Sequence, residues 1–468
     1  MRGALGVIIG CALGWAHAAV LPVPVGRVLD GHGISADDVS IVVQALDSDE
    51  PALSHLADEP RNPASVMKLL TTWAALEILG PAYTWTTEVY FDGEFDGATL
   101  DGDLVLKGYG DPYLVLEEFW KLLRALRRMG LEEITGDLVI DDSYFAVEED
   151  DPGAFDGQPF RAYNVLPNAL LVNFQAVNFQ FFVDARSGGI RVATEPSLSN
   201  LDVRNRVGIA DGPCRGYQAG ISLFVVGEDL SAVDLGGAFP RRCGSYALTR
   251  SVLRHDTYAY GLFESLWTEL GGRFDGTLRK GVVAADRKPA MTWRSPPLGD
   301  VIRSINKNSN NVMTRQLLYT LGAEQLGAPG TRAHGVEVVE AFLATKGFDV
   351  DPLVIDNGSG LSRRGRVTAR LLVDLLRAAA ESPFAPEFMS SLSLGGLDGT
   401  TRRRFNGRAG TLHVKTGRLD HVSALAGYVR AASGAPVVVT ILVNSENAHR
   451  GPGQELEEAV VEWAHGAL

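Results

Sequence analysis

The chain has 468 residues, of which 46% are hydrophobic and 21% charged. This composition excludes an intrinsically disordered chain and allows one large domain or two to three smaller ones. The formal net charge is -14, from 43 basic and 57 acidic residues, and there is no long basic run, so nucleic acid is not expected as a partner.

The first residues have the three parts of a secretory signal peptide. Met1-Arg2 gives a positive start, Ala4–Trp15 an apolar stretch and Ala16-His17-Ala18 a cleavage site. We therefore expect this segment to be removed and the mature protein to be exported to the periplasm. A lipoprotein signal ending at Cys11 is the alternative, although Ile8-Ile9-Gly10 departs from its usual pattern. No later run of about 18 apolar residues predicts a transmembrane anchor.

After this segment the pattern changes twice along the chain. Ser40–Ala45 predicts a strand, and Ala64–Leu79 predicts an apolar helix that begins near Ser65. Between about Thr84 and Ala285, short alternating runs and Asp-Gly turns predict a β-rich region with one helix. The predicted elements that follow the strand and the first helix are the helices Glu117–Gly130, Leu298–Leu321, Gly335–Lys346 and Val367–Ala380, the strands Thr411–Lys415, Ala424–Val429 and Val437–Val443, and the helix Gly453–Ala467.

Strands near both chain ends, with helices around them, predict an α/β (α+β) domain built from both termini. We expect residues 19–85 and 286–468 to form this domain, after a signal peptide at residues 1–18. Residues 86–285 are then one or more inserted domains, mostly β.

Two cysteines remain once the signal segment is removed. Cys214 and Cys243 lie in Gly-rich polar surroundings, and in an exported chain we expect them to form a disulfide. None of the nine histidines belongs to a metal-binding pattern, so we expect no metal and no cofactor.

The candidate chemistry begins with Ser65-Val66-Met67-Lys68 at the start of a helix. Residues i and i+3 share a helix face, so the lysine amine can reach the serine hydroxyl and, when desolvated, act as its base. A second match, Ser304-Ile305-Asn306-Lys307, lies on an amphipathic helix and is interpreted as a solvated polar face. Ser65 is preferred because the helix after it is apolar.

Two further motifs follow in order. Ser309-Asn310-Asn311 places a hydroxyl and an amide in one turn, where they can relay a proton and hold the base. Lys415-Thr416-Gly417 lies on a predicted strand, where the glycine allows a substrate chain to approach and the lysine and threonine can bind a carboxylate. Each motif alone is commonplace, but the ordered set indicates a serine-nucleophile acyl-transfer enzyme.

These motifs resemble those of the class C low-molecular-mass penicillin-binding proteins, the penicillin-binding protein 4-like D-alanyl-D-alanine carboxypeptidase/endopeptidases. The resemblance covers nearly the whole mature chain. The long stretch between Lys68 and Ser309 matches the large insertion of this class. Further segments that carry it are Gly108-Tyr109-Gly110-Asp111-Pro112, Ser295-Pro296-Pro297-Leu298, Asn306–Asn311 and Asp356-Asn357-Gly358-Ser359-Gly360-Leu361-Ser362-Arg363.

The resemblance implies an acyl-enzyme on Ser65, formed with the peptidoglycan stem peptide or with a β-lactam. Lys68 is then the base, and Lys415 keeps it deprotonated. Ser309 passes a proton to the leaving amine, and Asn311 positions Lys68 and the substrate. Residues assigned to substrate binding are Thr416, Gly417, Arg418, Arg363, Asp141 and Phe145, the last three beside the side chain of the stem peptide.

The chain departs from the family pattern at two places. Arg418 stands where the family commonly has Thr or Ser, so one hydroxyl expected at the substrate carboxylate is missing. Thr314-Arg315 stands where relatives tend to have Ala-Glu, and we interpret this as a surface change.

Two alternatives remain open. A serine β-lactamase or esterase uses the same motifs, but no Glu-x-x-x-Asn segment of the class A kind stands out between Lys68 and Ser309. A non-catalytic cell-wall binding protein is the other, and the intact motif residues argue against it. The sequence does not separate carboxypeptidase from endopeptidase activity, and it leaves the oligomeric state undetermined.

Overall fold

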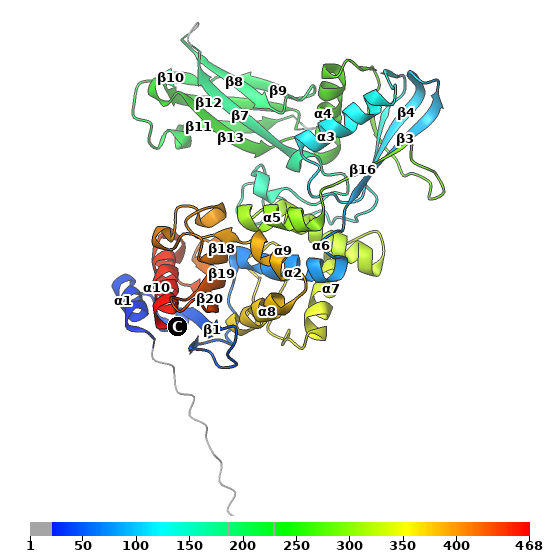
Figure 1. Cartoon of the computed structure of the whole chain (residues 1–468). Coiled ribbons are helices and arrows are strands. Elements are labelled where there is room, and N and C mark those ends of the chain that lie inside the picture. The colour runs from blue at the N-terminus through cyan, green and yellow to red at the C-terminus, as the bar shows by residue number, and fades with distance from the viewer. Residues whose placement is uncertain (1–20, 185–187, 228–229) are drawn as a thin grey trace, which may run out of the picture.

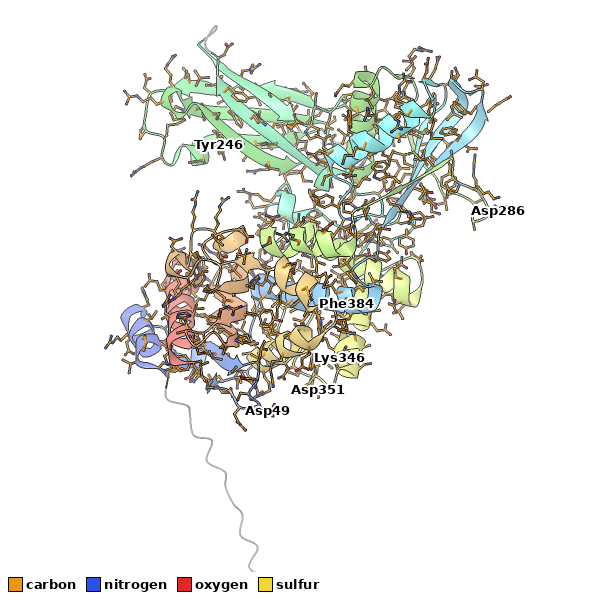
Figure 2. The ribbon with its side chains drawn as sticks, in the orientation of Figure 1. Asp49, Tyr246, Asp286, Lys346, Asp351 and Phe384 are labelled. Atoms are coloured by element: carbon orange, nitrogen blue, oxygen red, sulfur yellow. A yellow bond between two sulfur atoms is a disulfide. The ribbon has the colours of Figure 1, made fainter. Side chains whose placement is uncertain are left out.

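The computed structural model describes residues 21–184, 188–227 and 230–468. They form two bodies, one above the other in Figure 1, and both ends of the described chain lie in the lower one. Side chains fill both bodies, with Tyr246 in the upper and Lys346 in the lower (Figure 2). We call the lower body the terminal domain and the upper body the insertion.

The terminal domain is built on one antiparallel sheet. Its strands combine the first described part of the chain with the last, as the sequence predicts for a domain formed by both termini. In spatial order they are β17 (Ser393–Leu394), β18 (Leu412–Leu419), β19 (Val422–Arg430), β20 (Pro436–Asn444), β1 (Val39–Ala45) and β2 (Leu53–His55).

Both faces of this sheet are covered by helices. Alternate residues of β1 face opposite sides, so Ile41 and Val43 pack into one core and Val42 into the other. Continuous burial along β19 and β20 has the same cause. The helices on one face are α1 (Val23–His32) and α10 (Pro452–Ala467), and those on the other are α2 (Lys68–Leu79), α5 (Leu298–Asn308), α6 (Asn311–Leu326), α7 (Arg332–Thr345), α8 (Ala369–Glu381) and α9 (Ala385–Ser391).

The insertion is mostly β, in agreement with the sequence pattern. Its seven-stranded sheet packs against two helices, α3 (Leu116–Arg128) and α4 (His255–Glu269). The sequence pattern predicts only the first of these helices. The strands of this sheet are β3 (Thr86–Phe95), β4 (Thr99–Gly108), β5 (Glu133–Ile134), β6 (Leu138–Asp141), β14 (Arg273–Phe274), β15 (Leu278–Lys280) and β16 (Met291–Arg294).

Two smaller sheets extend the insertion. One contains β13 (Ser245–Ser251), β7 (Ala176–Val183) and β8 (Ile190–Glu195), and the other contains β9 (Asp202–Asn205), β10 (Gly208–Ala210), β11 (Ile221–Val226) and β12 (Ala232–Pro240). The predicted disulfide between Cys214 and Cys243 is present and joins the segment after β10 to the turn after β12.

The chain enters and leaves the insertion at one point. Trp85 N donates to Ser295 Oγ and Ser295 N donates to Trp85 O, both at 3.0 Å. Because β16 pairs with β3, the insertion sheet continues to Arg294, beyond the boundary expected at residue 285.

The predicted signal peptide lies outside the described residues. Over the ranges that the structure describes, no helix has both the length and the apolar character needed to cross a membrane.

Candidate active site

Ser65 and Lys68 are positioned by a short 3-10 turn, η2 (Ala64–Met67), that leads directly into α2. Lys68 is fully buried, Ser65 is half-buried, and Lys68 Nζ lies 3.0 Å from Ser65 Oγ. Leu69 and Trp73 of the same helix pack in the core of the terminal domain. The apolar character of α2 therefore fixes the backbone that carries the nucleophile and its base.

Three oxygens surround the Lys68 amine. Besides Ser65 Oγ at 3.0 Å, it contacts Asn311 Oδ1 at 2.7 Å and the carbonyl oxygen of Ser359 at 2.5 Å. An ammonium can donate to all three oxygens; in the neutral amine, Asn311 and Ser359 accept the two hydrogens and the lone pair is left for the Ser65 hydroxyl. Burial lowers the pKa of Lys68 well below its ordinary value, and the charges of Lys415 and Arg315 lower it further.

Ser309 and Asn311 belong to the sharp connection between α5 and α6. Ser309 ends α5 in the left-handed region, with φ 54°, and the side chain of Asn310 caps α6 by accepting from Met313 N. A non-glycine residue in that region is uncommon and concentrates at functional sites. The turn brings Asn311 to Lys68 and Ser309 Oγ to within 2.9 Å of Lys415 Nζ.

Lys415, Thr416 and Gly417 lie on β18, which runs beside η2. A Cβ at position 417 would lie 2.4 Å from the carbonyl oxygen of Pro63 and 3.1 Å from Ser65 N. Only glycine permits this approach, which places the backbone of β18 against the nucleophile. Lys415 is fully buried, and burial lowers its pKa to about 7.

One edge of β18 is open beside the nucleophile. β19 pairs with the strand along its whole length, whereas β17 pairs with it only at His413 and Val414. In the described part of the chain, the ladder on that side thus stops before Lys415. An extended peptide can add to such an edge through backbone hydrogen bonds.

Arg363 lies over a cavity of about 380 Å3 between the two bodies. Its guanidinium stands 5.1 Å from the ring centre of Phe155 and 3.6 Å from the Asp420 carboxylate. Asp150 and Asp151 also line the cavity. The cavity therefore combines a cation, an aromatic ring and carboxylates.

Asp141 and Phe145 contribute to the packing of the protein instead of lining this cavity. The Asp141 carboxylate is fully buried, lies 3.5 Å from Lys107 Nζ and accepts from Val283 N at 2.8 Å. Phe145 is buried against Tyr319. The residues of this part of the chain that line the cavity are Asp150, Asp151 and Phe155.

Arg315 was expected at the surface, and that expectation is wrong. Its side chain is buried and donates to the carbonyl oxygens of Tyr163 and Asn164 in the insertion. The arginine thereby fastens the loop beside the cavity to α6. Its charge also acts on Lys68, as described above.

The second Ser-x-x-Lys match has a structural role. Lys307 Nζ contacts the Leu392 carbonyl oxygen at 2.8 Å and the Asp398 carboxylate at 2.6 Å. These contacts direct the Lys307 amine to Leu392 and Asp398, so it does not serve as a base for Ser304.

The acceptor supplied by Ser359 has no counterpart in the residue roles expected from the sequence. It is a backbone carbonyl, so the identity of the side chain at position 359 does not predict it. The neighbouring Gly360 gives the only signal: it has φ 75°, and a Cβ there would lie 1.8 Å from the Ala64 carbonyl oxygen. The Gly-Ser-Gly segment is required for close packing against the nucleophile turn.

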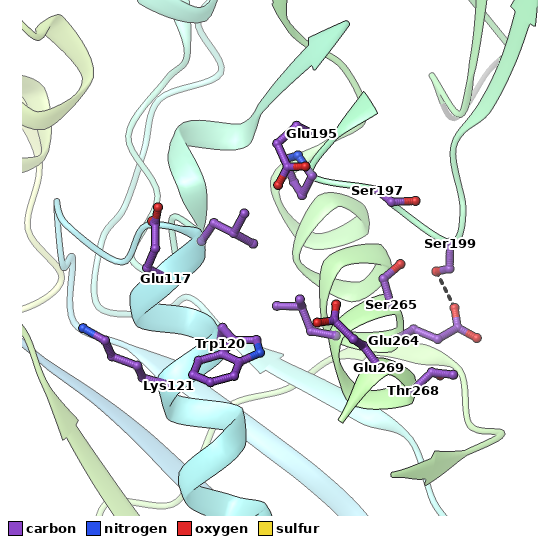
Figure 3. Close-up of a pocket in the computed structure, with 13 residues that line it drawn as sticks. Glu117, Trp120, Lys121, Glu195, Ser197, Ser199, Glu264, Ser265, Thr268 and Glu269 are labelled. Atoms are coloured by element: carbon purple, nitrogen blue, oxygen red, sulfur yellow. Dashed lines mark hydrogen bonds between the residues drawn. The ribbon is translucent and has the colours of Figure 1, made fainter. Parts of the chain in front are cut away.

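The cavity in Figure 3 is larger, about 840 Å3, but lies in the insertion between α3 and α4. Of its three serines, Ser197, Ser199 and Ser265, Ser199 donates to Glu264 at 2.5 Å. Its lysine, Lys121, is paired with the carboxylate of Glu118, which raises the pKa of the lysine. The arrangement suited to acyl transfer is the one around Ser65.

Comparisons with known proteins point to one family of peptidases. A model of the D-Ala-D-Ala carboxypeptidase 3 (S13) family matches residues 25–466. The chain is 31% identical over 445 residues to a D-alanyl-D-alanine carboxypeptidase of Actinomadura sp. (strain R39), across 92% of this chain and 81% of the relative. It is 25% identical over 389 residues to the D-alanyl-D-alanine carboxypeptidase DacB of Haemophilus influenzae, across 81% and 80% of the two chains.

Solved structures show the same fold. Penicillin binding protein 4 of Haemophilus influenzae aligns with a TM-score of 0.79 at 21% identity, over 95% of this chain and 100% of that one. A predatory endopeptidase of Bdellovibrio bacteriovorus aligns with a TM-score of 0.54 at 17% identity, over 91% of each chain. The predicted fold class, a transpeptidase-like domain with a β insertion, is confirmed.

Proposed function

Because the chain belongs to the D-Ala-D-Ala carboxypeptidase 3 (S13) family, we propose that Ser65 is the nucleophile through which it acts on the D-alanyl peptides of peptidoglycan. The protein is a serine-type D-Ala-D-Ala carboxypeptidase/endopeptidase, a peptidase hydrolase. The observation that carries the assignment of Ser65 is its contact with Lys68, a buried amine 3.0 Å from the hydroxyl whose pKa is lowered by burial and by nearby positive charges.

Acylation follows from this arrangement. Ser65 Oγ attacks the carbonyl carbon of the penultimate D-alanine while Lys68 takes the hydroxyl proton. The backbone N–H groups of Ser65 and Arg418 stabilise the oxyanion, each worth a few kcal/mol. The close approach of Gly417 to Ser65 N, where an added Cβ would lie 3.1 Å away, supports this pairing because Arg418 follows Gly417 on β18.

The leaving amine then needs a proton. Ser309 Oγ, 2.9 Å from Lys415 Nζ, donates its own proton and receives the one that Lys68 took from Ser65, and the C–N bond breaks to leave an ester on Ser65. Water attacks that ester, the new carboxylate departs and the hydroxyl of Ser65 is restored. When Lys415 is protonated, its positive charge disfavours a proton on Lys68 and so favours the neutral form of Lys68.

The substrate lies along the open edge of β18. Its terminal carboxylate is placed beside Thr416, with Arg418 supplying a positive charge. The stem-peptide side chain enters the cavity below Arg363, where that cation and the carboxylates of Asp150 and Asp151 suit a side chain bearing both an acid and an amine.

We place the mature protein outside the cytoplasm, in the periplasm. The apolar leader and the disulfide between Cys214 and Cys243 support this location, because disulfides persist in oxidising compartments.

Intact-mass spectrometry after incubation with benzylpenicillin tests the proposal. Native protein should gain one penicilloyl group, Ser65→Ala should gain none, and Ser304→Ala, which alters the second Ser-x-x-Lys match, should behave as native. Absence of an adduct with the penicillin intact would refute the serine-peptidase proposal and favour a cell-wall binding protein. Rapid hydrolysis of the penicillin would instead favour a β-lactamase.

A further inference from the structure

Thr416 has a hydroxyl neighbour from outside the three motifs. Thr416 Oγ1 donates to Thr400 Oγ1 at 2.7 Å. Thr400 lies in the loop between β17 and β18, and its side chain is exposed. The hydroxyl of Thr416 is therefore held by a residue on a different segment.

The sequence around Thr416 explains why such a neighbour matters. Successive side chains of a strand point to opposite faces, so Thr416 and Arg418 share a face while Lys415 lies on the other. Arg418 occupies the position where the family commonly has a hydroxyl. Without that hydroxyl, β18 itself offers one hydroxyl and one guanidinium to a substrate carboxylate.

The loop that carries Thr400 is held by its own contacts. Lys307 neutralises Asp398 and bonds to the Leu392 carbonyl oxygen, and the Asp398 carboxylate also accepts from Leu394 N at 2.7 Å. Gly399 has φ 56°, and a Cβ there would lie 2.3 Å from Ser393 Oγ. A larger residue at 399 would push Thr400 away from β18.

Ser393 completes a row of three hydroxyls. Its Oγ accepts from Thr400 N at 3.3 Å and lies 3.3 Å from Thr400 Oγ1, where either oxygen can be the donor. Ser393 is fully buried and pairs with Val414 in the ladder between β17 and β18. The row Ser393–Thr400–Thr416 thus begins in the sheet and ends at the substrate edge.

From this row we infer that Thr400 is a positioning residue for the substrate carboxylate, holding the Thr416 hydroxyl in the orientation that donates to it. The inference rests on the proposed function. A carboxylate only accepts hydrogen bonds, so a bound substrate turns the Thr416 hydrogen toward itself. Thr400 then becomes the donor to Thr416 and accepts from Ser393. The loop thus orients the one hydroxyl that β18 offers to the carboxylate.

The test compares acylation by benzylpenicillin, which carries a carboxylate, with acylation by its methyl ester, which does not. Thr400→Val removes the hydroxyl at constant shape, Thr400→Ser keeps it, and Thr345→Val makes the same change on an exposed helix end, at α7. For benzylpenicillin, Thr400→Val should lower the second-order acylation rate about fivefold, the size of one hydrogen bond, and the other two variants should stay within about twofold of native. The methyl ester should react equally with all four proteins.

A peptide ending in D-Ala-D-Ala gives a second readout. Because the carboxylate contact is the same in the bound substrate and the transition state, Thr400→Val should raise KM and leave kcat unchanged. Equal slowing of both β-lactams, a loss in kcat alone, or no effect of Thr400→Val would overturn the inference and leave the proposed function intact. Failure of the native protein to be acylated by either compound would refute the proposed function and, with it, the inference.

Discussion

Replacing Asn311 with aspartate should convert Lys68 from a base into an ammonium ion. Asn311 Oδ1 lies 2.7 Å from Lys68 Nζ, and Lys68 is fully buried. The substitution keeps the size and the hydrogen bond of the side chain but adds a negative charge. A nearby opposite charge favours the protonated amine, so the depressed pKa of Lys68 should rise.

The separation of the two groups sets the size of the effect. At an effective dielectric constant of about 20, unit charges at 2.7 Å attract by about 6 kcal/mol. Burying a second charge offsets part of this, and we take about 3 kcal/mol as the remainder. The pKa of Lys68 should therefore rise markedly. Acylation should then fall at the pH where Lys68 is protonated in the variant and recover as the pH increases.

The pH profile of the penicillin acylation rate measures this shift. Asn311→Ala is the matched control, because it removes the acceptor without adding charge and should slow acylation without moving the profile to higher pH. An Asn311→Asp profile that coincides with the native one, at an unchanged thermal midpoint, would refute the conclusion that Lys68 acts as a neutral base.

Three other substitutions test separate parts of the structure. Gly417→Ala should slow acylation at least tenfold, since its Cβ would meet Pro63 O at 2.4 Å. The control Gly26→Ala, where a Cβ meets nothing within 4 Å, should be acylated at the native rate. Equal acylation rates for Gly417→Ala and the native protein would argue against the close packing of β18. Arg315→Met should lower stability by about 1–3 kcal/mol because two carbonyl oxygens lose their donor; an unchanged chemical-denaturation midpoint would contradict this. The double variant Cys214→Ser/Cys243→Ser should destabilise the insertion by about 3 kcal/mol while the acylation rate stays native, and a large loss of rate would show that the disulfide supports the active site.

Much of the site was predictable because its side chains have distinctive types in a fixed order. Ser65, Lys68, Ser309, Asn311 and Lys415 meet as the motifs suggest. The contributions of Ser359 and Thr400 were not predicted. The first is a backbone carbonyl and the second a common residue in a loop, and only the folded chain brings either one to the site.

The misplaced expectations also have physical causes. Helix α4 was missed because aromatic residues such as Tyr258, Phe263 and Trp267, which favour strands, are frequent in it, and Gly261 lies at its centre. Tertiary packing against the insertion core overrides these preferences. Arg315 was expected at the surface because arginine is rarely buried, whereas here carbonyl oxygens of the insertion receive its hydrogens.

The hydrogen bonds between Trp85 and Ser295 mark the point at which the insertion joins the terminal domain. Since the chain leaves and returns between two residues that are already bonded to each other, a short turn can close the terminal domain in its place. An insertion connected at one such point can be gained or replaced in a hydrolase of this fold without changing the strand order of its central sheet. A shortened enzyme would then lose the insertion loops that contact Arg315 and line the Arg363 cavity.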